Sequence, residues 1–284
     1  MNIFNLIDHS FSHHVGVGLP DYSVAGNSSE IIKWDRTLSD KKKPIFFSNE
    51  KVLEVKKYPK NEYKNYGFVF ESQAIIAPIY EELNSLSSNF EKIFTHSSKL
   101  LKSLDNALWI PGGGCWVGGS YAGGERKIFP KDKLCSMVTS PKQLCQMHTK
   151  RVEIANFLQQ NSEVDVFGLG EDKSIQSFKA TERYMFSVAV ENYIDELYFT
   201  EKILNCFCTG TIPIYFGATE IDKKFNSEGI LKFSSISELQ KILLKLTPDY
   251  YYSKIPAVKE NFEKSFEFIT IEDYIYKNYQ NLFL

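Results

Sequence analysis

The sequence predicts an α/β protein whose second half is built on a parallel sheet. Two observations support this prediction. From about residue 134 onward, short apolar segments of strand length alternate with longer segments of helical length. Glycines separate these segments, since Gly168 and Gly217 close two strands and Gly210 ends a helix. Strands that alternate with helices in this way form parallel sheets, because each helix carries the chain back to the start of the next strand.

The composition is that of an ordinary globular protein. The 284 residues are 43% hydrophobic and 24% charged, and they suffice for one large domain or two modest ones. A net charge of -2 gives no reason to expect nucleic acid or an anionic membrane surface as a partner.

No secretory signal or membrane-spanning segment is predicted. The first residues, MNIFNLI, are too short for a signal-peptide core and lack a basic flank. The uncharged run 106–124 contains seven glycines and one proline, which favour a loop over a spanning helix. Five cysteines without a Cys-x-x-Cys spacing predict reduced, mostly buried thiols. We therefore expect a cytoplasmic protein, with peripheral attachment to a membrane left open.

The first half of the chain is irregular. Its apolar runs predict four short buried strands and one helix, with solvated connections between them. The strands are expected at 3–7, 44–48, 66–71 and 91–96, the helix at 74–86, and a solvated connection at 51–64. The glycine-rich segment 109–133 that follows suits a domain junction or an active-site loop. It is no phosphate-binding loop, because no Lys-Ser or Lys-Thr follows the glycines.

The second half gives the regular alternation. Strands are expected at 135–140, 164–168, 184–192, 211–217 and 230–233, and helices at 142–160 and 200–209. Ser235 and Glu238 form a capping-box pattern that opens a further helix. The aromatic-rich tail, about 256–284, is also expected to be helical.

Polar residues stand where the strand at 184–192 ends and the next helix begins. Glu191 and Asn192 close the strand, and Tyr198, Glu201 and Lys202 surround the start of the helix. In open parallel sheets ligands bind beyond the carboxyl ends of the strands, where helix N-termini favour anions. A carboxylate beside a lysine suits a nucleotide, with Glu201 accepting from ribose hydroxyls and Lys202 contacting the diphosphate. A solvated first helical turn, where glutamate is favoured in any case, is the alternative.

These residues resemble a known family. The segments YMFSVAVEN (184–192) and LYFTEKILNCFCTGTIPIYFG (197–217) are similar to the donor-binding signature of the α-1,3/1,4-fucosyltransferases, glycosyltransferase family 10. The matching residues are Tyr184, Phe186, Glu191, Asn192, Tyr198, Thr200, Glu201, Lys202, Pro213 and Gly217. Upstream, the resemblance aligns Arg151 with the arginine that holds the donor diphosphate in the family. It is specific over about 135–235 and weak elsewhere.

The resemblance implies a GT-B fold, in which two Rossmann-like domains face each other across a cleft. We expect an acceptor-side domain at 1–133 and a donor domain at 134–284, with the last helix a candidate to pack back on the first domain. It implies an inverting glycosyltransferase, α-1,3-fucosyltransferase-like, that takes GDP-fucose as donor and an oligosaccharide or lipid-linked glycan as acceptor. We expect no cofactor and no metal, because the sequence contains no Asp-x-Asp and because Arg151 and Lys202 supply positive charge.

The family's catalytic base is a glutamate in a Glu-Ser-Pro motif of the N-terminal domain. Here FVFESQ (68–73) offers Glu71, with Gln73 in place of the proline. Glu50, which closes the apolar run IFFSNE (45–50), is the runner-up. A role in capping the next helix is open for both glutamates.

Four positions depart from the family pattern: Pro141, Val190, Tyr193 and Leu197. These departures bear on how the donor sugar is bound, and not on how the diphosphate is bound. They therefore leave open a GT-B transferase that uses another nucleotide sugar, or a catalytically inactive nucleotide-sugar or glycan-binding protein.

Overall fold

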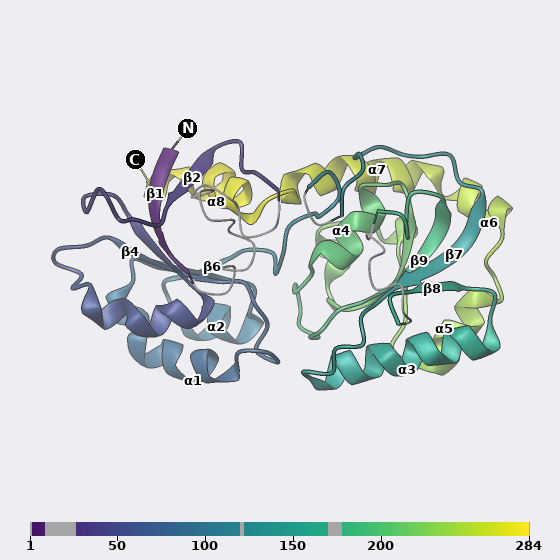
Figure 1. The fold of residues 1–284 in the computed structure, drawn as a ribbon, viewed down its shortest axis with the longest axis horizontal. Helices are drawn as coiled ribbons and strands as arrows, with labels where there is room; N and C mark the ends of the chain where they lie inside the picture. The colour runs from purple at the N-terminus through teal and green to yellow at the C-terminus, as the bar shows by residue number, and fades with distance from the viewer. Residues whose placement is uncertain (1, 9–26, 120–121, 170–177, 284) are drawn as a thin grey trace. The chain divides into compact units, whose positions relative to one another are not determined.

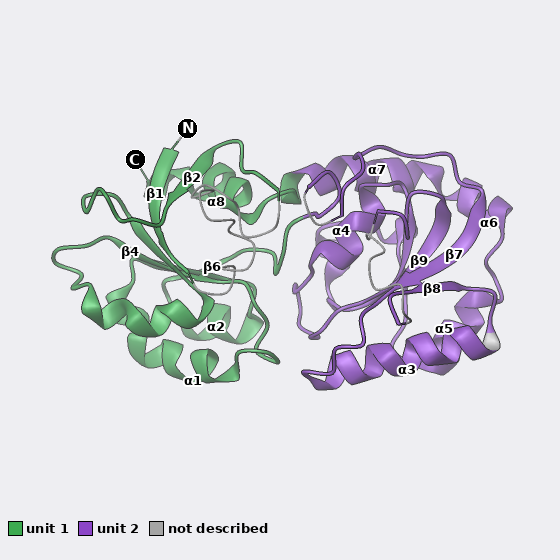
Figure 2. Ribbon diagram, viewed as in Figure 1, with its two compact units in different colours: residues 1–114, 267–284 green, residues 115–266 purple. Residues whose placement is uncertain are grey.

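The chain folds into two compact units, which Figure 2 colours separately. The structure, a computed structural model, describes residues 2–8, 27–119, 122–169 and 178–283. Unit 1 comprises Met1–Gly114 and Glu267–Leu284, and unit 2 comprises Cys115–Phe266. The division thus falls earlier in the chain than the junction expected after residue 133. The reason is local: the side-chain oxygen of Asn205 accepts hydrogen bonds from the backbone N–H groups of Trp116 and Val117, which binds this segment to unit 2.

Unit 1 is built on a six-stranded sheet in which every pairing is parallel. In spatial order its strands are β2 (Ile32–Asp35), β1 (Asn2–Ile7), β3 (Ile45–Ser48), β4 (Asn65–Val69), β5 (Lys92–Thr95) and β6 (Ala107–Trp109). The helical elements are η1 (Asn49–Lys57), α1 (Ala77–Leu86), η2 (Ser87–Asn89), α2 (Ser98–Ser103), α8 (Ile271–Tyr279) and η6 (Gln280–Leu282). Figure 1 shows α1 and α2 on one face of the sheet and α8 on the other.

The tail of the chain completes the core of unit 1. Phe283 lies among aromatic rings of the central strands, with its ring centroid 5.1 Å from that of Phe4 and 5.9 Å from that of Phe46. The buried carboxylate of Glu272 on α8 accepts a hydrogen bond from the Trp34 indole of β2 at 3.1 Å. Asp273 accepts a further hydrogen bond from the Ser29 hydroxyl. Because the central strands β3 and β4 are covered on both faces, every residue in them is buried.

Unit 2 has a five-stranded sheet, again parallel in every pairing. In spatial order its strands are β11 (Leu231–Lys232), β10 (Ile212–Phe216), β9 (Tyr184–Val190), β7 (Lys133–Val138) and β8 (Asp165–Phe167). The helices are α3 (Gln146–Asn161), α4 (Glu201–Phe207), η3 (Ile221–Lys223), η4 (Ser227–Gly229), α5 (Ile236–Leu243), α6 (Pro248–Ser253) and α7 (Ile255–Ser265). The short η5 (Phe266–Phe268) follows α7 and ends in the part of the chain that belongs to unit 1. Figure 1 shows α3 and α5 on one face and α4 and α7 on the other.

The strand order of unit 2 reverses between β7 and β9. The chain runs from β7 outward to β8 and then returns to the other side of β7 to form β9, β10 and β11. The connections that leave β7 and β9 therefore diverge at the carboxyl ends of these two strands. In doubly wound sheets such a switch point forms a crevice in which ligands bind.

A buried lysine holds the opposite end of this sheet together. The Lys131 ammonium donates to the carbonyl oxygens of Thr181, Glu182 and Thr209 at 3.0, 3.1 and 2.8 Å, and to the Thr211 hydroxyl at 2.9 Å. Burial lowers the pKa of Lys131 to about 7, while four surrounding oxygens favour its ammonium form. One side chain thus joins the start of β9, the end of α4 and the start of β10.

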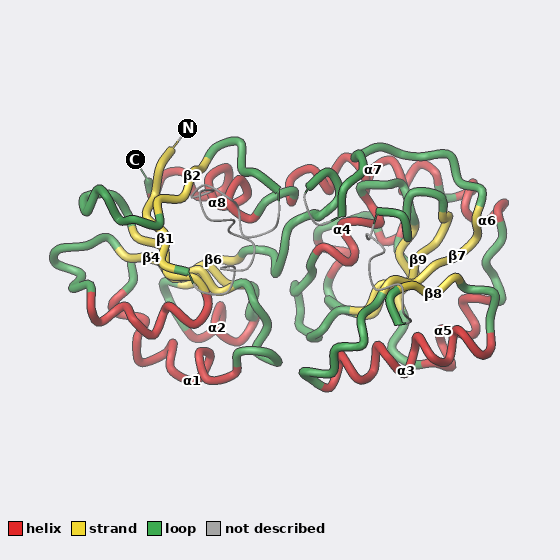
Figure 3. Tube along the Cα trace, in the orientation of Figure 1, coloured by secondary structure: helices red, strands yellow, loops and turns green. Residues whose placement is uncertain are grey.

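Most of the predicted elements are confirmed, with ends shifted by a few residues. The short strands β2 and β6 and the helix α2 were not predicted from the sequence. The prediction of a solvated connection at 51–64 was wrong in part, because η1 packs Val52 and Val55 fully into the core. Within the described part of the glycine-rich segment, the chain beyond β6 is loop apart from one isolated bridge, as Figure 3 shows.

Four of the five cysteines are buried, and the fifth, Cys145, is half-buried. Two of them meet in unit 2, where the sulfur atoms of Cys115 and Cys208 lie 3.1 Å apart. Among the helices that the structure describes, none combines the length and the apolar character needed to cross a bilayer.

Candidate functional site

The predicted donor-side residues gather at the switch point of unit 2. Glu191 directly follows β9, and Thr200 is the N-cap residue of α4. Arg151 lies on α3, the helix that follows β7. The structure thus brings Arg151, Glu191 and Lys202 to the carboxyl ends of the two strands that flank the crevice.

Glu191 is fully buried and organises the start of α4. Its two carboxylate oxygens accept from the backbone N–H and the hydroxyl of Thr200, at 2.9 and 2.7 Å. Burial raises the pKa of Glu191, and the nearby Lys202 ammonium opposes this effect. Because both oxygens are engaged by Thr200, Glu191 acts on the site through the residues that it holds in place.

Gly217 allows the chain at the end of β10 to pass close to the Glu191 carboxylate. A Cβ atom on Gly217 would lie 2.3 Å from the Tyr215 hydroxyl oxygen and 2.6 Å from Cγ of Glu191. The Tyr215 hydroxyl itself accepts a hydrogen bond from the backbone N–H of Ala218 at 3.1 Å. The glycine that matched the family pattern is therefore required by the packing behind Glu191.

Glu201 and Lys202 contact each other. Lys202 Nζ lies 2.8 Å from Glu201 Oε1, 3.1 Å from Thr200 Oγ1 and 3.5 Å from Glu191 Oε2. The side chains of Lys202 and Glu201 are 21% and 14% exposed, so both still reach solvent. Burial alone would lower the pKa of Lys202, but the charges of the two glutamates outweigh it and raise that pKa. Lys202 is therefore a cation.

Arg151 is buried and incompletely satisfied. It is 7% exposed, and its Nη2 atom donates to the Ser140 hydroxyl at 3.2 Å. Its Nε atom is buried without a hydrogen-bond partner in the part of the chain that the structure describes. Burial lowers the pKa of Arg151, and the charges of Glu201 and Glu191 oppose this. A buried guanidinium with an unused donor suits an anionic ligand, which would supply the missing acceptor.

His148 is a site residue that sequence reasoning missed. It lies on α3 three residues before Arg151, and its Nδ1 atom accepts from the backbone N–H of Leu144 at 3.2 Å. Burial, together with the charges of Arg151, Lys202 and Lys142, lowers the pKa of His148 to about 4. At neutral pH it is therefore a neutral ring with a proton on Nε2. The three-residue spacing from Arg151 on a predicted helix was the available signal.

Asn192 and Tyr198 belong to the scaffold of the loop between β9 and α4. The Tyr198 hydroxyl donates to the side-chain oxygen of Asn192 at 2.6 Å, and the thiol of Cys145 donates to the Asn192 carbonyl at 3.3 Å. Tyr198 is buried, and its ring meets that of Tyr193 edge to face, with centroids 5.9 Å apart. Tyr193, a departure from the family pattern, thus packs against a residue that matches it.

The candidate bases lie in unit 1. Glu71 follows β4 and is half-buried, and its Oε1 atom accepts from the backbone N–H of Ser72 at 2.9 Å. Glu50 lies on η1 and is exposed. Both follow the carboxyl ends of neighbouring strands, since β3 pairs with β4 in parallel.

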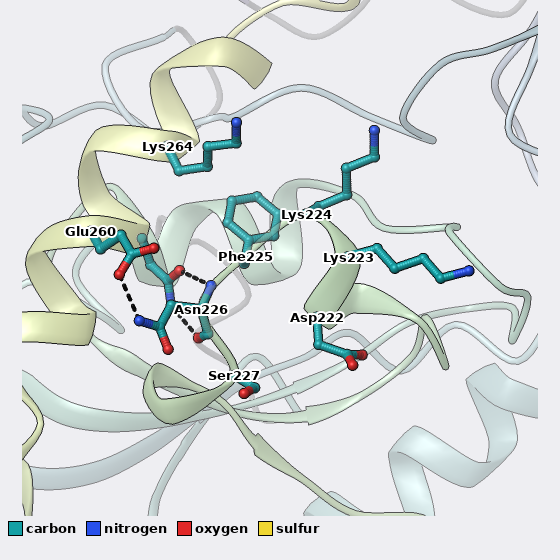
Figure 4. A pocket seen from close by; sticks show the side chains of 9 residues that line it. Asp222, Lys223, Lys224, Phe225, Asn226, Ser227, Glu260 and Lys264 are labelled. Atoms are coloured by element: carbon teal, nitrogen blue, oxygen red, sulfur yellow. Dashed lines mark hydrogen bonds between the residues drawn. The ribbon is translucent and has the colours of Figure 1, made fainter.

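Unit 2 also has an open cavity of about 470 Å³ near η3 and η4, away from the predicted residues. Its lining includes Lys223, Lys224 and Lys264, but Figure 4 shows that their ammonium groups do not converge on one point. Asp222 and Glu260 in the same lining offset their charge. The side chains drawn do not form an anion site.

Comparison with known proteins gives a consistent result. The sequence profile of glycosyltransferase family 10 (fucosyltransferase), C-terminal part, matches residues 128–269. An alpha-(1,4)-fucosyltransferase of Arabidopsis thaliana is 34% identical over 73 residues, which are 25% of this chain and 18% of the plant protein. The chain therefore matches less than a fifth of that relative's length.

Two solved structures share the fold over most of the chain. A crystal structure of an alpha1,3-fucosyltransferase with GDP has a TM-score of 0.56 and 14% identity, and covers 94% of this chain and 88% of that one. Another alpha1,3-fucosyltransferase structure has a TM-score of 0.54 and 16% identity, over 84% of this chain and 79% of that one. The α/β fold of GT-B type expected from the sequence is confirmed.

The site geometry has a clear chemical meaning. Two cations and a neutral imidazole lie at the switch point of unit 2, and one donor of Arg151 has no partner within the described parts of the chain. Glu201 adds a partly exposed carboxylate beside them. Such a set of groups is chemically suited to a polyanion that also carries hydroxyl groups.

Proposed function

Because the chain belongs to glycosyltransferase family 10, the fucosyltransferases, we propose that it transfers fucose from GDP-fucose to a glycan hydroxyl with inversion at the anomeric carbon. The observation that carries the proposal is the buried Arg151, whose Nε donor has no partner among the described residues, beside the Lys202 cation at the switch point of unit 2. The donor identity has separate support, since alpha1,3-fucosyltransferases of similar fold have been solved with GDP and with GDP-fucose.

Donor binding would rearrange the Glu201–Lys202 ion pair. Lys202 would turn from Glu201 to the diphosphate, which offers a stronger negative charge. Glu201 would then accept hydrogen bonds from the ribose hydroxyls. The Nε atom of Arg151, which has no partner among the described residues, would donate a hydrogen bond to a phosphate oxygen. Asn192 and Tyr198 would hold the loop that borders the nucleotide.

The transfer step needs a leaving group and a base. The acceptor oxygen would form a bond to the anomeric carbon while the bond from that carbon to the diphosphate oxygen breaks. Arg151 and Lys202 would stabilise the negative charge that develops on the diphosphate. Because the protein supplies these two cations, we propose turnover without a metal ion.

Glu71 is our proposed general base. It would remove the proton of the acceptor hydroxyl as that oxygen attacks from the face opposite the diphosphate. Such help is worth about 10²–10⁴-fold in rate. Glu50 is the alternative base. The acceptor would be an oligosaccharide or a lipid-linked glycan, and an α-1,3 linkage is the proposed product.

A donor screen tests the proposal. GDP, UDP and dTDP are compared by thermal shift, and GDP-fucose is then incubated with a panel of oligosaccharides that end in N-acetylglucosamine. We expect stabilisation by GDP, transfer of fucose and full activity in EDTA. Stabilisation by UDP or dTDP alone would favour the alternative of another nucleotide sugar. Binding of GDP without transfer to any glycan, in wild-type protein, would favour an inactive binding protein.

Loss of activity in EDTA that Mn²⁺ restores would contradict metal-independent turnover. Glu71→Gln should keep GDP binding and lose transfer. If Glu71→Gln retains transfer and Glu50→Gln loses it, the base is Glu50.

A further inference from the structure

The main chain of Glu71 is held on both sides by buried side chains. We infer that Asn49 is a positioning residue, which, together with Tyr80, fixes the Glu71 carboxylate in the place where it takes the acceptor proton. The inference rests on the proposed function, in which Glu71 is the base. It goes beyond that function because it assigns a role to residues that touch no substrate.

Asn49 adopts an unusual backbone conformation for this purpose. It follows β3 with a φ of 45°, in the left-handed region that asparagine tolerates better than most residues. Its side chain is buried, and its Oδ1 atom accepts from the backbone N–H groups of Phe70 and Glu71 at 3.2 and 3.1 Å. Residues held in such sparsely populated regions concentrate at functional sites.

The strand register explains how Asn49 reaches Glu71. Strands β3 and β4 are parallel neighbours, with Ser48 opposite Phe68. Asn49 and Glu71 therefore leave the sheet at the same edge. The left-handed turn at Asn49 places its side-chain oxygen against the backbone of the neighbouring strand's exit.

Tyr80 holds the other side of the Glu71 peptide. Its hydroxyl donates to the Glu71 carbonyl oxygen at 2.6 Å and lies 3.1 Å from Nε2 of His96. His96 is fully buried, and its Nε2 atom also lies 3.3 Å from the Glu71 carbonyl oxygen. Tyr80 has one hydroxyl proton, which it donates to the Glu71 carbonyl oxygen. The hydrogen bond between Tyr80 and His96 is therefore donated by His96 Nε2 to the Tyr80 hydroxyl oxygen.

These contacts fix three atoms of one residue. The N–H of Glu71 is held by Asn49, its carbonyl by Tyr80, and its Oε1 atom by the N–H of Ser72. A general base must lie within hydrogen-bond reach of the proton that it removes. A displacement of about 1 Å can cost on the order of 10²-fold in rate. Loss of the Asn49 acceptor should therefore slow the proton transfer without changing donor binding.

Three substitutions separate the possible roles of Asn49. Asn49→Asp keeps both the side-chain acceptor and tolerance of the left-handed conformation. Asn49→Gly keeps the conformation and removes the acceptor, and Asn49→Ala removes both. Asn65→Ala is the matched control, because Asn65 is also buried in unit 1 but lies at the amino end of β4, where it bonds the carbonyl of Tyr58 at 2.7 Å.

The full-length variants are assayed for release of GDP from GDP-fucose with a mixture of oligosaccharides ending in N-acetylglucosamine. We expect Asn49→Gly and Asn49→Ala to lower kcat about 10–100-fold at unchanged KM for GDP-fucose and unchanged Kd for GDP. Asn49→Asp should restore most of kcat, and Asn65→Ala should leave it unchanged. Hydrogen exchange at the amides of Phe70 and Glu71 should accelerate in Asn49→Gly and stay slow in Asn49→Asp.

Two outcomes overturn the inference in distinguishable ways. If Glu71→Gln abolishes transfer while Asn49→Gly keeps the wild-type kcat, Glu71 remains the base and Asn49 does not position it. If Glu71→Gln is active, the base assignment in the proposed function is wrong, and the role of Asn49 is lost with it.

Discussion

The ammonium of Lys202 lies 2.8 Å from the carboxylate of Glu201, its immediate neighbour on the chain. Adjacent residues on a helix do not face each other, yet the long lysine side chain turns back across the N-cap to make this contact. A second carboxylate, that of Glu191, lies 3.5 Å from the same nitrogen. The ion pair keeps Lys202 charged and at the mouth of the crevice, where a stronger anion would compete for it.

Lys202→Gln should therefore weaken GDP binding. A hydrogen bond to a charged group contributes about 1.5–3 kcal/mol, which corresponds to a rise in Kd of roughly 10–150-fold. Isothermal titration with GDP measures the change. Lys150→Gln on α3 is the control, because Lys150 forms an exposed pair with Glu153. Equal Kd values for the two variants would exclude Lys202 from the nucleotide site.

Arg151→Met should separate stability from binding. The variant loses a buried charge whose Nε atom has no partner among the described residues, so unfolding without GDP should occur at the wild-type temperature or above it. The stabilisation by GDP should fall sharply, because the diphosphate loses a charged donor. Thermal unfolding with and without GDP gives both quantities. Arg183→Met is the control, since Arg183 forms an exposed pair with Asp132. A GDP-induced shift that survives in Arg151→Met would contradict the assignment.

Because of the buried His148, we expect the folded protein to lose stability in mild acid. Burial and the neighbouring cations lower the pKa of His148 from its ordinary 6.5 to about 4. Between these values the unfolded chain binds more protons than the folded one, so stability falls as the pH drops from 6.5 towards 4. The effect should stay below about 3 kcal/mol at the acid end, because solvent screens part of the interaction. Urea unfolding across this range should show a smaller decline in His148→Gln than in wild type, and parallel curves would refute the prediction.

Lys131→Met should destabilise unit 2. The substitution leaves three carbonyl oxygens and a hydroxyl in the interior without their ammonium donor. We expect a loss of about 2–4 kcal/mol in the free energy of unfolding, since each unsatisfied buried group costs about 1–3 kcal/mol and some have second partners. Lys133→Met, two residues along, removes a surface pair with Asp165, whose lysine is 42% exposed, and a contact with the Tyr184 hydroxyl. It should cost much less. Similar losses in both variants would show that the buried contacts of Lys131 contribute little.

The sequence was informative where local pattern and site chemistry coincide. Strand β9 and helix α4 were predictable because an apolar run, a capping threonine and a closing glycine follow one another within one stretch. Arg151 came from the family resemblance, and its place on α3 agrees with the helix predicted there.

Contacts between distant segments could not be read in this way. Asn49 reaches the backbone 22 residues later only because β3 and β4 are neighbours, and strand order is a property of the whole sheet. The contact between Glu201 and Lys202 depends on side-chain conformation, which a sequence does not give. The sequence therefore predicted separate ligand groups for two side chains that contact each other in the structure. Strand β2 (IKWD) has two charged residues among its four, so no apolar run marks it, and β6 (ALW) has only three residues.

The packing of residues 267–284 against unit 1 has a consequence for the order of folding. Unit 2 is one uninterrupted stretch of chain, inserted between the two parts of unit 1. During synthesis all of unit 2 leaves the ribosome before Glu272 and Phe283 are available to Trp34 and Phe4. The half of the protein that contains Arg151 and Lys202 can thus mature first. The aromatic core of unit 1, the half that contains Glu71, stays exposed until residues 267–284 have been synthesised. We therefore expect unit 1 to depend more than unit 2 on protection from aggregation.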